Sequence, residues 1–406
     1  MTTSLPEAHW RRRTGFNALC VLLGADEGEV RIVGGAVRDG LLGIEVNDID
    51  LATRLLPDEV TRRLTAAGIK VVPTGIAHGT VTAIVDHRPV EITTLRRDVS
   101  TDGRRATIAY TDDWQADAAR RDFTINALYA DPLSGQVHDY FGGLDDLAHR
   151  QVRFIGDARQ RIAEDHLRIL RFFRFLARFG TLPPDATAYE ACVATANSLM
   201  ALSRERIADE VMKLLALTDP APVVRLMIDG GIFAPVLPEI EATGLARLEA
   251  LLRKEREAAI TLPSPLIRLA ALLPQDAVVG EQAAARLKLS NKARKRIAAA
   301  LAPPPPHGSP FELAFRVGQE TAIDQMLLIV GDNAVDIRAM AGWTMPEFPI
   351  GGRDLLRLGI EPGPTVAQLL GAVRERWIAE GFPDSARARA LAADYVSEFK
   401  RESQKS

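Results

Sequence analysis

The chain of 406 residues is long enough for two to four domains, and its 47% hydrophobic and 25% charged residues are ordinary for a soluble globular protein. A net charge of −3 excludes a globally basic nucleic-acid-binding protein, and the lack of an 18-residue apolar run excludes a membrane span. Two cysteines, Cys20 and Cys192, exclude a disulfide framework and favour a reducing compartment, so we expect a cytoplasmic protein.

Strand and helix patterns alternate in the N-terminal third. VRIVG (30–34) is an apolar run stopped by glycine and predicts a buried strand, and AVRDGLLG (36–43) predicts a short helix. DIDLAT (48–53) predicts a second strand and PDEVTRRLTAAG (57–68) a helix. TVTAIVDHRPVEITTL (80–95) alternates on both sides of a DHRP turn, which predicts a hairpin. We therefore expect a mixed sheet with helices.

The strand pattern nearly disappears after Gly156. Residues 157–180 place apolar side chains at helical spacing, and further helices are expected to about residue 300. APPPPHGSP (302–310) cannot be helical and predicts a linker, with more helices beyond it. The predicted fold class is α+β, with an N-terminal head of mixed β-sheet and helices followed by an elongated all-α portion.

We divide the chain into four predicted parts. They are a head (1–148), a helical neck (149–215), a helical body (216–301) and a helical tail (311–406). The first boundary follows the change from mixed to helical pattern, and the last follows the proline-rich linker.

A glycine pair precedes two closely spaced aspartates in VGGAVRDGLLGIEVNDIDLAT. Asp48 and Asp50 lie two apart in a predicted strand, so we expect both carboxylates on one side, where a divalent cation such as Mg²⁺ would relieve their repulsion. Gly34 and Gly35 would let backbone N–H groups approach a phosphate, and Arg38 would add a cation. An acidic pair alone is more often an ordinary strand end, but this full arrangement is far more specific.

Four later motifs accompany this segment: VEITTLRRD (90–98), RRDFTINALY (120–129), DYFGGLDDL (139–147) and EDHLRILR (164–171). In this order they resemble the nucleotidyltransferase superfamily of DNA polymerase beta, and within it the class II tRNA CCA-adding enzymes and bacterial poly(A) polymerases. LSRERIADEVMKLL, RLKLSNKARKR and FPIGGRDLL continue the resemblance more weakly. It implies a catalytic head, base recognition in the neck, and RNA binding by the body and the tail.

The resemblance also implies a role for individual residues. Asp48 and Asp50 match the catalytic metal ligands, and Glu91 is either a third acidic group near the metals or a structural residue. The nucleotide-binding residues that it implies are Gly34, Gly35, Arg38, Asp39, Arg120, Arg121, Asp122, Asn126, Asp165, Arg168 and Arg171.

Asp122 matches the position that selects the ribose, where a carboxylate accepts a hydrogen bond from the 2′-hydroxyl. Arg120 and Arg121 match arginines on the phosphate and ribose sides. The ordinary alternative is a salt-bridged helix start with Asp122 as the N-cap.

Asp165 and Arg168 are three apart, so we expect them on one helix face. A carboxylate accepts from an exocyclic amine and a guanidinium donates to a ring nitrogen or carbonyl, so the pair can bind C or A and reject U and G. By resemblance, this is a protein template in place of a nucleic-acid one. The ordinary alternative is an exposed ion pair between Glu164 and Arg168.

Three further segments bear on the RNA substrate. Residues 96–106 resemble the flexible loop of enzymes that add the terminal A, with a plain hairpin loop as the alternative. Residues 150–178 contain eight arginines and three acidic residues, and 286–296 contain six Lys or Arg and no acid. Such local patches would suit the phosphates of a tRNA acceptor arm, although a basic helix is more often a solvated face.

The function implied is addition of CCA to tRNA 3′ ends from CTP and ATP, with Mg²⁺, without a nucleic-acid template and with release of pyrophosphate. Poly(A) polymerase, an A-adding tRNA enzyme and a non-catalytic RNA-binding relative are the alternatives. TGIAHGTVTAIV (74–85) stands where bacterial poly(A) polymerases usually carry a basic GRRF-like stretch, which favours CCA addition. We expect tRNA, CTP and ATP as partners, no membrane and no obligate protein partner.

Overall fold

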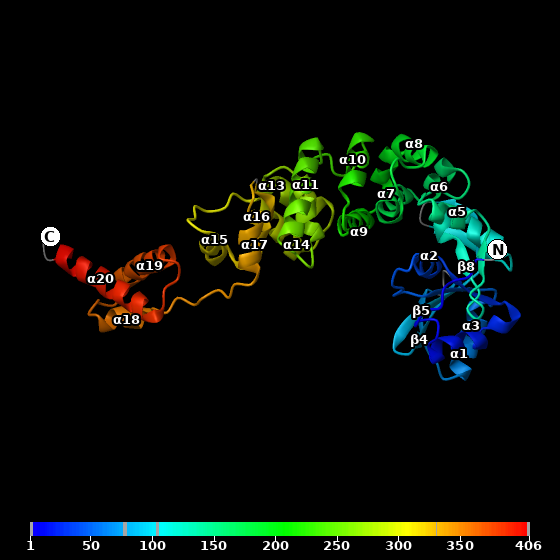
Figure 1. Cartoon of the computed structure of the whole chain (residues 1–406), viewed down its shortest axis with the longest axis horizontal. Helices are drawn as coiled ribbons and strands as arrows, with labels where there is room; N and C mark the ends of the chain where they lie inside the picture. Colours follow the sequence, from blue (N-terminus) through cyan, green and yellow to red (C-terminus); the bar gives the residue numbers. More distant parts are fainter. Residues whose placement is uncertain (1–2, 76–78, 103–104, 330, 404–406) are drawn as a thin grey trace. The chain divides into compact units, whose positions relative to one another are not determined.

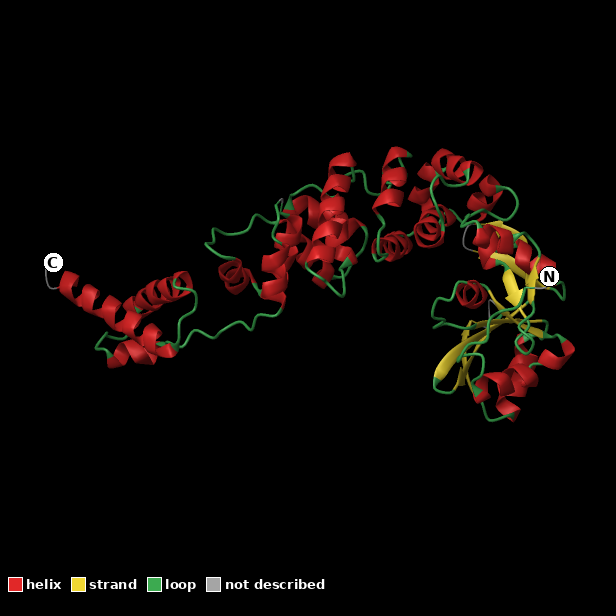
Figure 2. Ribbon diagram, viewed as in Figure 1, coloured by secondary structure: helices red, strands yellow, loops and turns green. Residues whose placement is uncertain are grey.

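The computed structural model describes residues 3–75, 79–102, 105–329 and 331–403. The chain forms two compact units, residues 1–238 and residues 239–406 (Figure 1). Every strand of the described residues lies in the first unit, and the second is helical (Figure 2). The predicted mixed sheet with helices, followed by helices alone, is confirmed.

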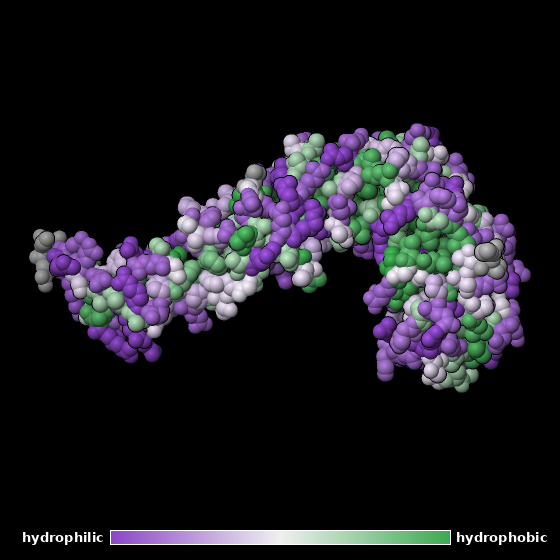
Figure 3. Space-filling model, viewed as in Figure 1, coloured by the Kyte–Doolittle hydropathy of each residue, from purple (hydrophilic) through white to green (hydrophobic). Residues whose placement is uncertain are grey.

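Parts of two predicted segments lie outside the described residues, namely 76–78 of the TGIAHG stretch and 103–104 of the expected flexible loop. The division of the chain into four parts stays a prediction. Hydrophilic residues cover much of the C-terminal unit on the face drawn in Figure 3. Within the described part of the chain, no helix is both long and apolar enough to span a membrane.

The strands are β1 (Val30–Val33), β2 (Asp50–Thr53), β3 (Lys70–Gly75), β4 (Thr80–Val85), β5 (Arg88–Thr94), β6 (Arg96–Asp102), β7 (Arg105–Tyr110), β8 (Leu128–Ala130) and β9 (Val137–Asp139). Seven of them form the main sheet in the order β3-β4-β5-β2-β1-β8-β9, and β6 and β7 form a separate hairpin. β2 and β5 are parallel, and the other neighbouring pairs of the main sheet are antiparallel. The expected loop at 96–106 thus belongs to a hairpin that lies outside the main sheet.

Glycine, proline and turn residues set the ends of these elements as predicted. Gly34 follows β1 with φ +67°, a conformation that favours glycine, and the chain turns there into a helix. Pro57 is the first residue of the next helix, and Gly68 follows its end with φ +70°. Asp86 and His87 both have positive φ and form the two-residue turn between β4 and β5.

The helices of the first unit are α1 (Thr14–Leu22), η1 (Ala25–Glu27), α2 (Gly35–Leu41), α3 (Pro57–Ala66), α4 (Trp114–Ala119), η3 (Thr124–Asn126), α5 (Gly143–Ala148), α6 (Ala158–Glu164), α7 (Arg168–Phe179), α8 (Ala186–Ala194), η4 (Ala196–Ala201), α9 (Arg204–Leu215) and α10 (Ala221–Asp229). The predicted helical stripe from 157 to 180 is therefore two helices. Asp165 caps the end of α6 in an extended conformation, and its carboxylate accepts the Leu167 N–H, which competes with continuation of the helix. The prediction that Asp165 and Arg168 share one helix face was wrong.

A cluster of aromatic rings joins the head motif RRDFTINALY to α7. Phe123 lies 5.0 Å from Phe154 and 5.0 Å from Phe175, between ring centroids, and Phe154 stacks on Phe172 at 5.8 Å. Phe123 and Phe172 are fully buried. Because Phe123 follows Asp122, this packing fixes the motif against the helix that carries the neck arginines.

The helices of the second unit are α11 (Ala242–Glu257), α12 (Pro265–Leu272), α13 (Ala277–Arg286), α14 (Asn291–Leu301), α15 (Pro310–Val317), α16 (Gln319–Leu328), α17 (Ala334–Ala341), α18 (Gly352–Arg357), α19 (Pro364–Ala379) and α20 (Ser385–Ser403). The proline-rich stretch after Leu301 is non-helical, as predicted. Helices on either side of it are joined, because Arg296 of α14 donates to Asp324 of α16 at 2.7 Å. α18, α19 and α20 enclose a core around Trp377.

We predict that Phe172→Ala lowers the free energy of unfolding by about 3–5 kcal/mol, because it removes a fully buried ring from the aromatic cluster. Urea unfolding followed by circular dichroism measures the change. Phe311→Ala, in the second unit, is the comparison, and it should lower the free energy of unfolding of the second unit only. An unchanged unfolding midpoint for Phe172→Ala would contradict the packing described here.

Candidate active site

Every residue that the sequence assigns to the site lines one cavity of ≈ 990 Å³ in the first unit. These residues come from the β1–α2 junction, the start of β2, β5, the segment after α4, and the region of α6 and α7. They are Gly34, Gly35, Arg38, Asp39, Asp48, Asp50, Glu91, Arg120, Arg121, Asp122, Asn126, Asp165, Arg168 and Arg171. Their common location is observed, whereas their individual roles stay predictions.

Three carboxylates gather at one end of β2. Asp50 is the first residue of this strand and lies opposite Glu91 of the parallel strand β5. Asp48 lies in the loop before β2 and not in the strand, contrary to expectation. The pairing of β1 with β2 ends at Ile32 and Leu51, because β1 stops where the chain turns into α2. The residues before Asp50 therefore have no strand partner on the β1 side.

The carboxylates affect one another electrostatically. Burial in the cavity and the charge of Glu91 raise the pKa of Asp50 to about 6, with a further contribution from Asp48 and an opposing one from Arg121. Among the described residues, no group of three or more His, Cys, Asp and Glu side chains is arranged to hold a metal ion by itself. Carboxylate oxygens are the ligands that a hard divalent cation prefers, and such an ion would take its remaining ligands from water and phosphate oxygens.

Gly34 and Arg38 both form hydrogen bonds within the protein. The Gly34 N–H donates to the Leu128 carbonyl at 3.0 Å, so this N–H is used within the sheet. Arg38 is 6% exposed, donates to Asp39 at 2.8 Å and to Asn126, and lies over the Phe179 ring at 4.0 Å. Arg38 lines the cavity, but its guanidinium is buried and already paired, so its role as a fixed cation for a triphosphate stays a prediction.

Asp122 is held as a carboxylate at the floor of the cavity. It is 8% exposed, and it accepts from Arg171 Nε at 2.8 Å and from Asn126 Nδ2 at 3.0 Å. Burial opposes its charge, but Arg171 and Asn126 more than offset that and lower the pKa of Asp122. Asp122 also accepts the Phe123 N–H. The salt bridge of the ordinary alternative is present, but Asp122 is not the N-cap, since Phe123 takes that position before η3.

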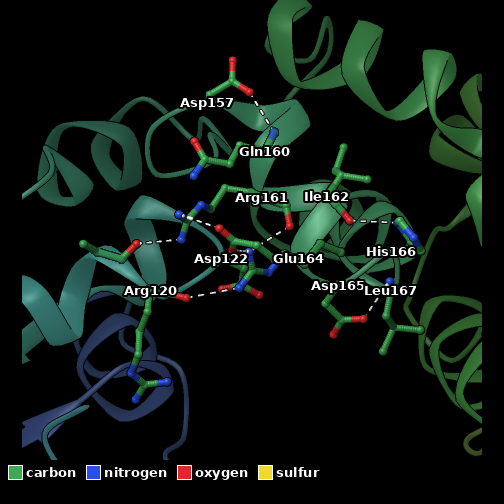
Figure 4. Close-up of polar contacts among 12 residues, drawn as sticks. Arg120, Asp122, Asp157, Gln160, Arg161, Ile162, Glu164, Asp165, His166 and Leu167 are labelled. Atoms are coloured by element: carbon green, nitrogen blue, oxygen red, sulfur yellow. Dashed lines mark hydrogen bonds and ion pairs between the residues drawn. The ribbon is translucent and has the colours of Figure 1, made fainter. Parts of the chain in front are cut away.

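The predicted base-recognition residues lie at the break between α6 and α7. Asp165 accepts from Arg206 of α9 at 2.7 Å and, as drawn in Figure 4, from the Leu167 N–H. Arg168 pairs with Glu164 at 2.6 Å and donates to the Arg120 carbonyl at 3.1 Å. An ion pair between Glu164 and Arg168 is therefore present, but it is mostly buried and not exposed as in the ordinary alternative. The side chains of Asp165 and Arg168 both line the cavity.

Further side chains line the cavity that no motif singled out. Arg174, Phe175 and Arg178 of α7 lie on the same wall as Arg171, and Lys213 comes from α9. Their spacing of three, four and seven from Arg171 follows one face of a helix and was available in the sequence. In the sequence, the arginines among them are visible only as part of the basic cluster at 150–178.

Many arginines of the two basic clusters form intramolecular ion pairs. In the first cluster, Arg153 pairs with buried Asp146 at 2.6 Å, and Arg174 pairs with Glu210 at 2.6 Å. In the second, Arg286 pairs with Glu239 at 2.5 Å. Each such pair reduces the positive potential available to RNA, so the count of basic residues overstates these patches.

Two family models match separate parts of the chain. Residues 30–153 match the Poly A polymerase head domain, which includes β1 to β9. Residues 184–243 match a model described as a probable RNA and SrmB-binding site of polymerase A.

Relatives of known activity match nearly the whole chain. A mitochondrial CCA tRNA nucleotidyltransferase 1 from Mus musculus is 36% identical over 94% of this chain and 90% of its own length. A CCA-adding enzyme from Levilactobacillus brevis is 30% identical over 88% of this chain and 91% of its own. The crystal structure of the Bacillus stearothermophilus CCA-adding enzyme with CTP superposes with a TM-score of 0.70 at 26% identity, covering 97% of this chain and 99% of that one. The chain therefore belongs to the family of CCA-adding tRNA nucleotidyltransferases.

Proposed function

We propose that this protein adds C, C and A to the 3′ end of tRNA, using CTP and ATP and no nucleic-acid template. The observation that carries the proposal is a single cavity that places the carboxylates of β2 and β5 beside the predicted base-recognition pair at the α6–α7 break. In each step the RNA 3′-oxygen forms a bond to the α-phosphorus, the bond to pyrophosphate breaks, and the hydroxyl proton leaves. Relatives named for CCA addition that match most of the chain support this reading over poly(A) synthesis.

Members of this family generally depend on a divalent metal ion, and we propose Mg²⁺ here. Asp48 and Asp50 would hold it, with Glu91 close enough in register to contribute. When bound, the ion supplies activation of the attacking hydroxyl and stabilisation of charge at the phosphate.

The arginines of the cavity would orient the nucleotide. Arg121 reaches the glycine turn, since a side chain at Gly34 would begin 3.5 Å from its guanidinium. The Asp122 carboxylate now accepts from Asn126 and the Phe123 N–H on one oxygen and from two nitrogens of Arg171 on the other. The 2′-hydroxyl of the ribose would therefore replace one of these donors. A carboxylate here favours a ribonucleotide over a deoxynucleotide.

Base choice would come from Asp165 and Arg168. Each is now paired within the protein, Asp165 with Arg206 and Arg168 with Glu164. A cytosine or adenine edge would present an amine to the carboxylate and an acceptor to the guanidinium. Uracil and guanine would present the opposite polarity and leave buried groups unpaired.

The tRNA would approach the open side of the cavity along α7 and α9, where Arg178 is 40% exposed and Lys213 is 54% exposed by side chain. Phosphate contacts of this kind position a folded RNA without reading its sequence. Location in the cytoplasm stays a prediction, because relatives in this family include mitochondrial proteins.

We predict that Asp48→Ala lowers kcat for nucleotide addition about 1,000-fold or more, because loss of a metal ligand removes several kcal/mol of transition-state stabilisation. The measurement is single-turnover extension of labelled tRNA, with tRNA binding followed separately and expected to persist. Asp58→Ala, an exposed carboxylate of α3, is the matched control and should keep full activity. An active Asp48→Ala protein would refute the assignment.

We predict that Asp165→Ala reduces the preference for CTP over UTP, in kcat/KM, by about 10- to 100-fold, which is the worth of one charged hydrogen bond. Both nucleotides are compared on tRNA that lacks its CCA end. Asp219→Asn changes an exposed acid of the same unit and should leave the preference intact. Unchanged selection in Asp165→Ala would exclude the template role.

A further inference from the structure

We propose that Asp117 is a positioning residue, which holds Arg120 and Arg121 in the nucleotide cavity and ties them to the β6–β7 hairpin. This inference rests on the proposed function. Asp117 lies on α4, is 1% exposed and does not line the cavity, so it would act on substrate only through these neighbours.

Each oxygen of this carboxylate binds a side chain of the site. One oxygen accepts from Arg120 Nε at 2.8 Å, and the other accepts from Arg121 at 3.2 Å and from the Tyr129 hydroxyl at 2.6 Å. Arg121 in turn donates to the Tyr129 hydroxyl at 3.1 Å. The two adjacent arginines are thus fixed to one buried anion, and rotation of either side chain would leave part of that anion unpaired.

These partners keep the buried carboxylate in its charged form. Burial alone would disfavour the charge of Asp117, but Arg121 and Arg120 outweigh it and hold the pKa of Asp117 at about 2. Asp117 is therefore charged under all working conditions. An ordinary core position would favour an apolar side chain, since a buried ion pair often contributes little net stability.

The same carboxylate contacts the hairpin directly and is linked to the base-recognition arginine through Arg120. The N–H of Arg96, the first residue of β6, donates to Asp117 at 3.2 Å. The backbone carbonyl of Arg120 in turn accepts from Arg168 at 3.1 Å. A continuous set of hydrogen bonds therefore joins the base of the hairpin, Asp117, Arg120 and Arg168. Displacement of the hairpin would therefore change the position of Arg168 through these contacts.

The test is Asp117→Asn in the full chain, with kcat and KM measured for CTP addition to tRNA lacking its CCA end. The amide keeps the shape and loses the charge, so the arginines stay near the site but lose their orientation. We expect kcat to fall about 10- to 100-fold, as for a small misplacement of catalytic groups, while the KM for tRNA stays unchanged.

Asp146→Asn is the matched control. Asp146 is also fully buried and bound to an arginine, but its partners Thr124 and Arg153 line a different cavity. A purely structural role for Asp117 predicts that both variants lose thermal stability and activity in parallel. Loss of kcat in Asp117→Asn alone, at similar loss of stability, supports the positioning role, and equal activities overturn it.

If Asp117→Asn does not fold, Asp117→Glu keeps the charge and displaces it by one methylene, and the same fall in kcat with retained tRNA affinity is expected. Wild-type kinetics for Asp117→Glu would overturn the proposal. The wild-type protein is assayed in parallel. An inactive wild type would overturn the proposed function and this inference with it, whereas an active wild type with an equally active Asp117→Asn would overturn this inference alone.

Discussion

The cavity depends on an unequal distribution of charge between its two walls. On the wall formed by β2 and β5, Asp50 faces Glu91 and Asp48, and the carboxylates raise one another's free energy. On the other wall, the arginines are neutralised by carboxylates of the chain, such as Arg171 by Asp122. We propose that the first wall binds a cation and that the second orients a nucleotide without a large excess of positive charge.

Packing of α7 makes this arrangement possible. Its apolar face enters the core through the phenyl rings around Phe123 and Phe172, and its opposite face presents arginines to the cavity. Two of these arginines are held by hydrogen bonds to buried carboxylates, Arg171 to Asp122 and Arg174 to Glu210. The helix therefore connects the head motif RRDFTINALY, through Phe123 and Asp122, to α9, through Glu210.

In the head, β1, α2, β2, α3 and the β4–β5 hairpin, and the gathering of the predicted residues in one cavity, could be predicted from the sequence because glycine turns, alternation and spaced motifs are local signals. The break at Asp165 could not, since its side chain competes with the helix only when the backbone is already formed around it. The burial of Arg38 depends on Phe179, which is distant in sequence. The role of Asp117 is not apparent from the sequence, because two of its partners, the Arg96 N–H of β6 and the Tyr129 hydroxyl of β8, are brought to it only by the fold.

The most direct test of this account is extension of purified tRNA that lacks its CCA end, with CTP, ATP, UTP and GTP supplied singly and together and the products sequenced. The account predicts CC from CTP alone, CCA from CTP and ATP together, and no addition from UTP or GTP. Long A tails would contradict it in favour of a poly(A) polymerase. A single A added only to tRNA already ending in CC would contradict it in favour of an A-adding enzyme.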